Sequence, residues 1–464
     1  LANIPDSVID ELAAYHIDAV WMMGVWTRSK AVRDSALNYM HEYKPVLPDL
    51  TEADVIGSAY AIGAYEVDPA AGGRDGLATL RQQLARRGIK LILDYVPNHV
   101  ATDHPATVNH LELFVHTNAE TNARYRGMFY PVKDRHGHTH YIAHGRDPYF
   151  PSWIDTAQLN AFHPAMREWT RHTLLDIAEQ CDGVRCDMAM LLTNEVFART
   201  WGAHVKERAP EVDFWPSIIP TIRQKHPNFL FMAEVYWNMD FMLQQQGFNY
   251  TYDKTLYDRL FEAEVDELRT HLLADIRFLR HTVHFLENHD EPRAASAYGV
   301  EKSHALAPLI CTVPGAVLLH DGQFEARRVK LPVQINRQPN EPLDLKLHAF
   351  YKRVLAEATH PVYTDGEWHL FTPIGAPVLA YGYRLDDEYR LVVVNLHGHD
   401  TQATIDLTAW GTHWSATDAL SGLRAVTNSG QLTLHVARYT ALMLHLTPQA
   451  ERGKAQRERQ ATQG

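Results

Sequence analysis

The feature that most constrains the fold is a repeated unit: an amphipathic helix, a turn containing Gly or Asp, and a short apolar strand that ends in polar residues. In one copy, the segment 75–87 has leucines at helical spacing, Gly88 can end the helix, and the strand LILDYVPNH follows at 91–99. A second copy has a helix that opens at Pro164 and the strand VRCD at 184–187. Such alternation of helices and apolar strands predicts an α/β fold with a parallel sheet.

The number of repeats favours a barrel. Seven strands can be placed, at about residues 19, 91, 184, 229, 248, 281 and 316. No glycine-rich phosphate loop of the dinucleotide type follows the first of them, so a (β/α)8 TIM-type barrel is favoured over a doubly wound sheet. Because the chain opens in an apparent helix, we expect the first barrel strand to lie upstream of Leu1 and to be absent here, which would leave two strand edges unpaired.

Two departures from the repeat predict further domains. Residues 100–163 lack strong periodicity and are far longer than a usual βα loop, so we expect an inserted subdomain after the third barrel strand. After about residue 358 the pattern changes to alternating segments with short polar turns, which predicts a C-terminal antiparallel β-domain at 359–447. The barrel would then comprise 1–99 and 164–358, and the polar stretch 448–464 would be a disordered tail.

Composition narrows the range of partners and compartments. The chain has 44 Lys and Arg against 56 Asp and Glu, a net charge of −12, which argues against a nucleic-acid or anionic-membrane partner. The longest apolar run, 305–319, is shorter than the roughly 20 residues of a membrane span and contains two prolines. The 3 cysteines are too few for a disulfide framework, which indicates either a reducing compartment or a fold that needs no disulfides, and we expect a cytoplasmic protein.

Acidic residues follow several of the strands. Arg185 and Asp187 lie two residues apart on one strand, so their side chains point to the same side, and the guanidinium would keep the carboxylate ionised as a nucleophile. Glu234 follows FLFMA and is flanked by apolar and aromatic residues, a setting that would keep it protonated as a general acid. Taken singly, each is more often a structural residue at a strand end.

The joint occurrence of such residues indicates catalysis. Asp94 with His99, and His289 with Asp290, follow two further strands, and strand ends in a barrel meet on one face. Carboxylates that repel one another at one face point to a catalytic site, and two of opposed protonation suggest cleavage of a glycosidic bond. The same four residues could instead bind zinc, which leaves a metal-dependent hydrolase as an alternative. The HGHTH segment at 136–140 invites the same interpretation, although alternating histidines in a polar hairpin are typical of a solvated strand face.

Four short segments, in their order and spacing, carry a specific resemblance. They resemble the four signature regions of the alpha-amylase superfamily, glycoside hydrolase family 13: DYVPNH (94–99), GVRCD (183–187), AEVY (233–236) and ENHD (287–290). The resemblance extends from Ile17 to about Leu446 and includes two further family stretches, SAYAIGAYEVDP (58–69) and DTAQLNAFHP (155–164). It implies the barrel, the inserted subdomain and the C-terminal β-domain expected above.

By position, the resemblance also implies roles for single residues. Asp187 would be the nucleophile, Glu234 the acid and then the base, and Asp290 the group that stabilises the transition state. The substrate-binding residues it implies are Tyr60, which would stack on the sugar, Asp94, which would order the strand ends, and His99, Arg185 and His289, which would hydrogen-bond the sugar.

The resemblance is incomplete at a position that concerns calcium. Met190 and Leu191 stand where many amylases of the family have a Lys-His pair that helps to bind the metal. Asn98 is a candidate calcium ligand, but one side chain does not make a site of about 6 to 8 oxygens. We therefore expect no required cofactor, and calcium is a weakly supported candidate ion.

These observations predict a retaining glycoside hydrolase acting on α-glucans or maltooligosaccharides, one that cleaves α-1,4-glucosidic bonds through a covalent intermediate on Asp187. A transglycosylase or a glucan- or trehalose-converting enzyme of the same superfamily stays open, since it would share this intermediate and differ only in the acceptor. A catalytically silent carbohydrate-binding homologue is less favoured, because the set of acids is complete.

Overall fold

The computed structural model describes residues 1–262 and 264–449, and the chain divides into two compact units. The first unit comprises Leu1–Tyr252 and Leu331–Asn340, and the second comprises Asp253–Lys330 and the chain from Glu341 onward. The tail predicted at 448–464 falls, from residue 450 on, outside the described residues.

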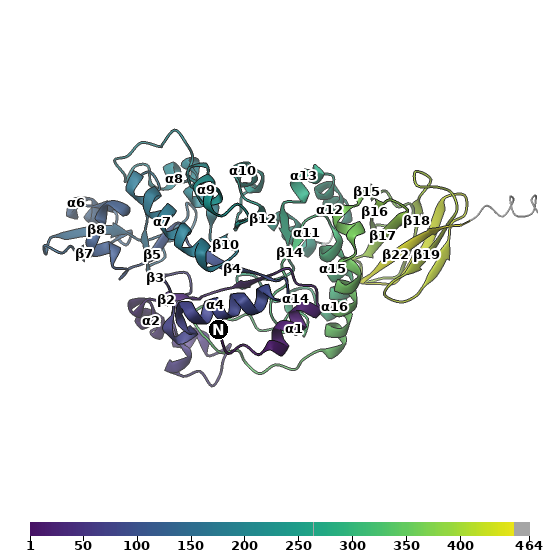
Figure 1. The fold of residues 1–464 in the computed structure, drawn as a ribbon, viewed down its shortest axis with the longest axis horizontal. Helices are drawn as coiled ribbons and strands as arrows, with labels where there is room; N and C mark the ends of the chain where they lie inside the picture. The colour runs from purple at the N-terminus through teal and green to yellow at the C-terminus, as the bar shows by residue number, and fades with distance from the viewer. Residues whose placement is uncertain (263, 450–464) are drawn as a thin grey trace, which may run out of the picture. The chain divides into compact units, whose positions relative to one another are not determined.

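Five parallel strands form the sheet of the first unit (Figure 1). In sheet order they are β1 (Ala19–Met22), β4 (Lys90–Tyr95), β10 (Gly183–Cys186), β11 (Leu230–Ala233) and β12 (Tyr250–Tyr252). The helices between them are α4 (Gly73–Ala85), α7 (Pro164–Gln180), α8 (Asn194–Trp201), α9 (Phe214–Lys225) and α10 (Asp240–Gln245). Helix α7 packs against both α4 and α9, because its apolar stripe of Met166, Leu174 and Ile177 is buried.

Helices and short strands fill the connections of this unit. Before β4 they are α1 (Asp6–Ala14), β2 (Trp26–Arg28), α2 (Lys30–Leu37), α3 (Met40–Tyr43) and β3 (Ile62–Val67). Between β4 and α7 they are β5 (His99–Ala101), α5 (Ala106–Asn109), β6 (His116–Thr117), α6 (Ala119–Arg124), β7 (Phe129–Lys133), β8 (Thr139–Ala143) and β9 (Thr156–Gln158). Here β6, β8 and β7 form an antiparallel sheet, and β5 pairs with β9. The insertion after the third barrel strand is thus confirmed, while its bounds of 100–163 stay a prediction.

The second unit contributes the last two parallel strands, β13 (Thr282–His284) and β14 (Ala316–Val317). Its helices are α11 (Lys254–Glu262), α12 (Val265–Leu272), α13 (Ile276–Leu279), α14 (Ala294–Ala297), α15 (Val300–Thr312), α16 (Leu345–Ala358) and α17 (Pro361–Asp365). All seven predicted strands are present, and with their helices they give the TIM-type barrel fold expected from the sequence. Among the described residues β1 is an edge strand of its sheet, and the strand expected upstream of Leu1 stays a prediction.

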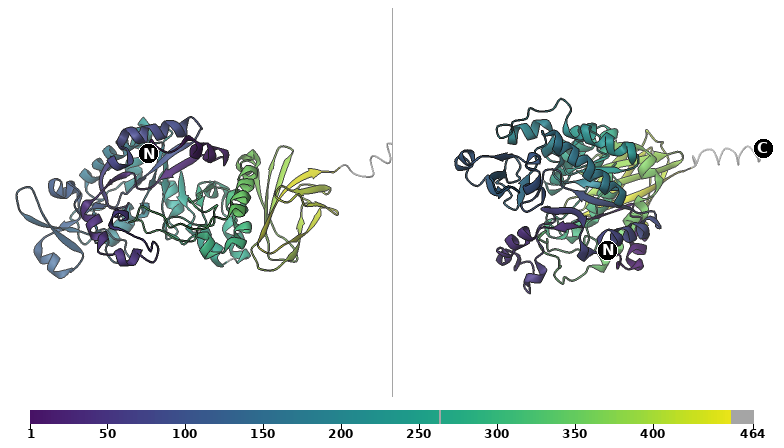
Figure 2. Two further views of the ribbon diagram at one scale, coloured as in Figure 1. Left: turned by 90° about the horizontal axis from the view of Figure 1, so that it is seen from below. Right: turned by 60° about the vertical axis from the view of Figure 1, so that its left-hand side comes forward.

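The C-terminal part of the second unit is a pair of antiparallel sheets, drawn in green to yellow in Figures 1 and 2. Its strands are β15 (Glu367–Phe371), β16 (Leu379–Leu385), β17 (Glu388–Asn395), β18 (Thr401–Asp406), β19 (Trp414–Asp418), β20 (Arg424–Val426), β21 (Gln431–Val436) and β22 (Thr440–Pro448). Side chains such as Leu391, Ile405 and Leu434 alternate inward and form the core shared by the two sheets. This confirms the predicted β-domain, whose bounds of 359–447 stay a prediction.

The opposite face of the larger sheet packs on α15 and α16. Tyr381 and Tyr383, both buried, reach Thr312 at the end of α15: their hydroxyls lie 2.7 Å from its Oγ1 and 2.6 Å from its carbonyl oxygen, respectively. Val392 and Met443 belong to the same buried cluster. Helix α15 also takes up most of the apolar run at 305–319, and no helix in the described residues is long and apolar enough to cross a membrane.

Candidate active site

Arg185 on β10 is the centre of a group of acids in the first unit. Its side chain is fully buried, and the strand register sets it beside Asp94 of β4 and Met232 of β11. Its Nη1 lies 2.8 Å from Asp187 Oδ1 and 3.4 Å from Asp94 Oδ1, and its Nη2 lies 2.9 Å from Glu234 Oε2. One guanidinium thus contacts the three predicted carboxylates of this unit, at the carboxyl ends of three adjacent strands.

Aromatic rings enclose the same guanidinium. Its Cζ lies 5.0 Å from the ring centre of Trp21, 5.4 Å from that of Tyr60 and 5.6 Å from that of Tyr252. Burial alone would lower the pKa of Arg185, but Glu234 above all, with Tyr252, Tyr60 and Asp187, raises it well above its usual value. The cation is therefore permanent, and it offsets the repulsion between the carboxylates.

Glu234 has a more polar environment than the sequence indicated. Its Oε2 accepts a hydrogen bond from the backbone N–H of Met188 at 2.7 Å, and its Oε1 accepts one from the hydroxyl of Tyr236 at 2.8 Å. With Arg185 it has three polar partners, so the predicted apolar setting is wrong, although Glu234 is buried as expected. Met188 has a φ of 43°, a left-handed conformation that costs a non-glycine residue about 1–3 kcal/mol and that accompanies this backbone contact.

His99 lies at the start of β5 and is buried. Burial lowers its pKa to about 4, against a weaker opposing effect of a backbone hydrogen bond with Tyr60, so the ring is neutral at neutral pH. Its Nδ1 lies 3.2 Å from Asn98 Nδ2, and its ring centre lies 5.2 Å from that of Trp153. A neutral imidazole suits hydrogen bonding to an uncharged hydroxyl.

The residues considered for metal binding have protein partners. The side chain of Asn98, the candidate calcium ligand, forms two hydrogen bonds with Gln158. Its Nδ2 donates to Gln158 Oε1 at 3.2 Å, and its Oδ1 accepts from Gln158 Nε2 at 2.9 Å. In the hairpin at 136–140, His138 and His140 lie 3.4 and 3.1 Å from Asp134. Within residues 1–262 and 264–449, no group of three or more His, Cys, Asp or Glu side chains is arranged to hold a metal ion.

His289 and Asp290 follow β13 in the second unit. His289 Nε2 lies 2.9 Å from Asp290 Oδ2, and His289 is buried while the Asp290 side chain is 46 % exposed. The structure therefore groups the predicted site residues within each unit. Those of the first unit are Tyr60, Asp94, His99, Arg185, Asp187 and Glu234, and those of the second are His289 and Asp290.

Apart from Tyr60, the sequence assigned no site role to the aromatic residues around these groups. Tyr236 had a signal, since it follows Glu234 at the two-residue spacing that places side chains on one side of a strand. Trp153 comes from the inserted region, far along the chain from its neighbour His99, and no local pattern marks it. Tyr149 and Trp237 were also missed: they are 61 % and 36 % exposed, and their rings meet edge to face with centres 5.0 Å apart.

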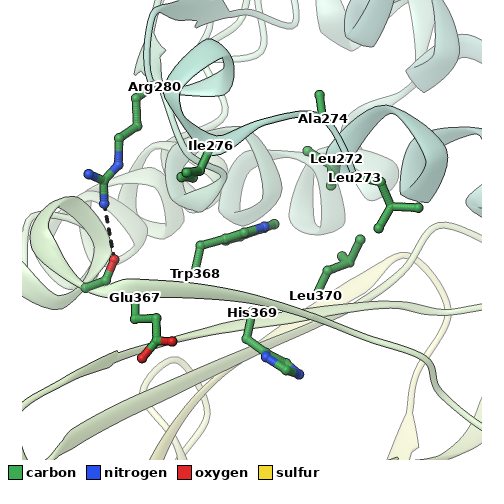
Figure 3. A pocket seen from close by; sticks show the side chains of 10 residues that line it. Leu272, Leu273, Ala274, Ile276, Arg280, Glu367, Trp368, His369 and Leu370 are labelled. Carbon is green, nitrogen blue, oxygen red and sulfur yellow. Dashed lines mark hydrogen bonds between the residues drawn. The ribbon is translucent and has the colours of Figure 1, made fainter.

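A separate cavity of about 470 Å³ lies in the second unit between α12, α13 and β15. Trp368 and Leu370 point toward the helices, whereas Glu367 and His369 point to the other side of the strand (Figure 3). Arg280 donates to the carbonyl oxygen of Gly366 at 3.2 Å at one end. No predicted site residue lines this mainly apolar cavity, so it does not provide the acids that hydrolysis needs.

Comparisons with known proteins bear on the family and the fold of this chain. Residues 9–326 match the family model described as alpha amylase, catalytic domain. Alpha-amylase MalA of Haloarcula japonica is 28% identical over 251 residues, which make up 52% of this chain and 32% of that protein. Alpha-amylase 3 of Dictyoglomus thermophilum is 20% identical over 293 residues, 59% of this chain and 55% of that protein. The chain thus spans about a third and about half of the length of these relatives.

The fold also matches solved structures. A noncanonic maltogenic alpha-amylase, AmyB from Thermotoga neapolitana, superposes with a TM-score of 0.70 over 96% of this chain and 94% of that one. At 19% sequence identity, this likeness supports the fold and leaves the activity to be argued from the site.

Proposed function

This chain belongs to the alpha-amylase family of glycoside hydrolases, and from that premise we propose that it cleaves α-1,4-glucosidic bonds of α-glucans with retention of configuration. The observation that carries the proposal is the pair formed by Asp187 and Glu234, which directly follow the neighbouring strands β10 and β11. Both carboxylates contact Arg185, at 2.8 and 2.9 Å, which brings a nucleophile and a proton-transfer group to one place.

In the first step, Asp187 attacks the anomeric carbon while the bond from that carbon to the leaving oxygen breaks, and Glu234 gives its proton to that oxygen. A glycosyl ester on Asp187 and a shortened glucan result. In the second step, Glu234 takes a proton from water, whose oxygen attacks the anomeric carbon and releases Asp187 as a carboxylate. We assign to Asp290 the stabilisation of the positive charge on the sugar in both transition states.

The polar partners of Glu234 add a requirement to this scheme. Its oxygens are engaged by Arg185, Met188 and Tyr236 before substrate enters. A protonated carboxyl no longer forms an ion pair with a guanidinium, so the Arg185–Glu234 contact has to loosen when Glu234 gains its proton.

Binding of the glucan would use neutral and aromatic groups of the first unit. His99 is neutral and can bond a sugar hydroxyl, and the ring of Tyr60 suits the apolar face of a pyranose. We add Tyr149 and Trp237, whose exposed rings meet each other, as contacts for sugars beyond the cleaved bond. Trp237 lies only three residues after Glu234.

The test is the stereochemistry of the first product. Proton NMR of a maltooligosaccharide digest should show the α-anomer before mutarotation, and Asp187→Asn and Glu234→Gln should each lose about 1,000-fold or more in kcat. An initial β-anomer, or undiminished turnover in either variant, would contradict the proposed roles.

Transfer to a second sugar is the other candidate, favoured by the exposed Trp237–Tyr149 pair as a surface for a sugar acceptor. Products longer than the supplied maltooligosaccharide would demonstrate it. Trp237→Ala should then lower the ratio of transfer to hydrolysis, because water needs no aromatic surface.

A further inference from the structure

We propose that Glu287 and Arg293 position Asp290 by fixing the loop that carries it. We call this buried pair the loop clamp, and its role in catalysis rests on the function proposed above. The loop runs from Glu287, three residues after the end of β13, to Ala294, the first residue of α14.

The loop clamp joins the two ends of the loop. Glu287 Oε1 lies 2.6 Å from Arg293 Nη1, and Glu287 Oε2 accepts the backbone N–H of Ala294 at 2.6 Å. The side chains of Glu287 and Arg293 are 0% and 3% exposed. Both oxygens of one buried carboxylate are thus used to hold the far end of the same loop.

The clamp is also tied to the chain that follows β14. Arg293 Nη1 donates to the carbonyl oxygen of Asp321 at 2.6 Å, and His320 Nδ1 lies 3.1 Å from Glu287 Oε1. These contacts fix the loop ends to a second segment, so the loop cannot shift as a unit without breaking charge-assisted bonds.

Inside the loop, the backbone around Asp290 is held as well. Asn288 Oδ1 accepts the N–H of Asp290 at 2.8 Å and that of Glu291 at 3.0 Å, and the Lys330 ammonium donates to the carbonyl oxygen of Asp290. The Asp290 carboxylate itself is half-exposed and pairs with His289. Its position therefore depends on the backbone, and the backbone depends on the buried frame.

Stability alone does not account for such a pair. Burying two charges removes their hydration, and replacing a buried ion pair by apolar residues of similar volume is often neutral or stabilising. A positional role explains why charges are kept directly beside a residue that must be accurately placed, because a misplacement of about 1 Å can cost about 100-fold in rate.

The test replaces the clamp as a whole in the full chain, with Glu287→Met and Arg293→Met combined. The matched control is Glu357→Met with Arg390→Met, since Glu357 is also joined by an arginine at 3.1 Å and by a histidine, His445, at 2.8 Å. We expect the clamp variant to lose about 30- to 100-fold in kcat with KM changed less than about threefold, and the control to keep its kcat.

Two further measurements separate positioning from general damage. In an Asp290→Asn background the clamp variant should cause little additional loss in kcat, since both changes act on one group. Hydrogen exchange of peptides covering 288–291 should be faster in the clamp variant than in the control. If the double variant does not fold, Arg293→Lys, which keeps the charge and loses the planar fork, takes its place in all three measurements.

Three outcomes would each overturn the inference. The clamp variant and the control could have equal kcat, or the loss in kcat caused by the clamp variant could be as large in the Asp290→Asn background as in the unaltered chain. Hydrogen exchange at 288–291 could also be unchanged in the clamp variant. An unaltered chain without activity on α-glucans would instead overturn the proposed function, and the exchange measurement would still decide whether the clamp fixes the loop.

Discussion

At the scale of single residues, Arg185 shows how one cation organises several acids. A lysine there would keep the charge, but its single ammonium could not contact Glu234 and Asp187 from the two ends of a planar fork. We expect Arg185→Lys to lower kcat/KM by about 100-fold or more. Steady-state kinetics on a maltooligosaccharide, with thermal melting to verify folding, provides the measurement, and near-normal kcat/KM would contradict the central place of Arg185.

His99 makes stability depend on pH. Its pKa is about 4 in the folded chain and about 6.5 when unfolded, so between these values the unfolded chain binds a proton that the folded chain does not. Above pH 6.5 His99 is neutral in both states and does not lower the free energy of unfolding. As the pH drops from 6.5 toward 4, the free energy of unfolding falls by about 3 kcal/mol in total for this residue.

His99→Gln should remove that part of the pH dependence. Urea unfolding between pH 4 and 7 would measure it, and the slope should shrink without vanishing, because burial also lowers the pKa of His104 to about 4. A slope equal to that of the unaltered chain would show that folding does not lower the pKa of His99.

Which residue-level features the sequence predicts depends on how local they are. Arg185 and Asp187 could be placed on one side of β10 because strand alternation is local. The polar setting of Glu234 could not, since one partner is the N–H of Met188 in a left-handed conformation, and a backbone group leaves no trace in the residue pattern. Trp153 reaches His99 from the insertion by tertiary packing, which local periodicity does not encode.

At the scale of elements, the strands were predictable because their apolar runs and polar exits repeat, and all seven appear within a few residues of the expected positions. The close approach of β10 to β11 requires a glycine at residue 183. A Cβ on Gly183 would lie 2.7 Å from both the Cβ and the carbonyl oxygen of Leu230 on β11. The start of β10 therefore accepts no side chain without moving its neighbour.

Gly183→Ala should destabilise the chain by about 1–3 kcal/mol. Gly76→Ala is the matched control: it lies within α4, its added Cβ would meet Ala71 at an ordinary 3.4 Å, and alanine favours helices. Thermal melting should give a clearly lower Tm for Gly183→Ala and an unchanged or higher one for Gly76→Ala. Equal Tm values would show that the sheet adjusts at β10.

At the scale of the whole molecule, we expect no requirement for calcium. Asn98 is occupied by Gln158, and Met190 and Leu191 are buried apolar residues. Activity on starch after treatment with a chelator and gel filtration should stay within about twofold of the untreated value, as should the Tm. A loss restored by added calcium would contradict the expectation and direct attention to backbone carbonyl ligands.

The division of the chain into units was not predictable from the sequence. The repeat continues past residue 252 in the sequence, yet the five strands up to Tyr252 belong to one compact unit, and β13 and β14 belong to the other. Periodicity reports which residues are buried within each element, whereas the grouping of elements depends on long-range contacts such as those of the segment Leu331–Asn340 with the first unit. In that segment, Arg337 pairs with Asp49 and Asp54 at 2.9 and 2.8 Å.

The contact of α15 and α16 with the larger C-terminal sheet determines how this protein can be shortened. The apolar residues of these helices and of the facing side of the sheet form one buried cluster, and Tyr381 and Tyr383 of the sheet are hydrogen-bonded to Thr312 of α15. A chain cut after residue 358 would present that apolar surface to water and would be prone to precipitate. The β-sandwich is therefore a structural part of the second unit, and it could not be removed as a detachable accessory module.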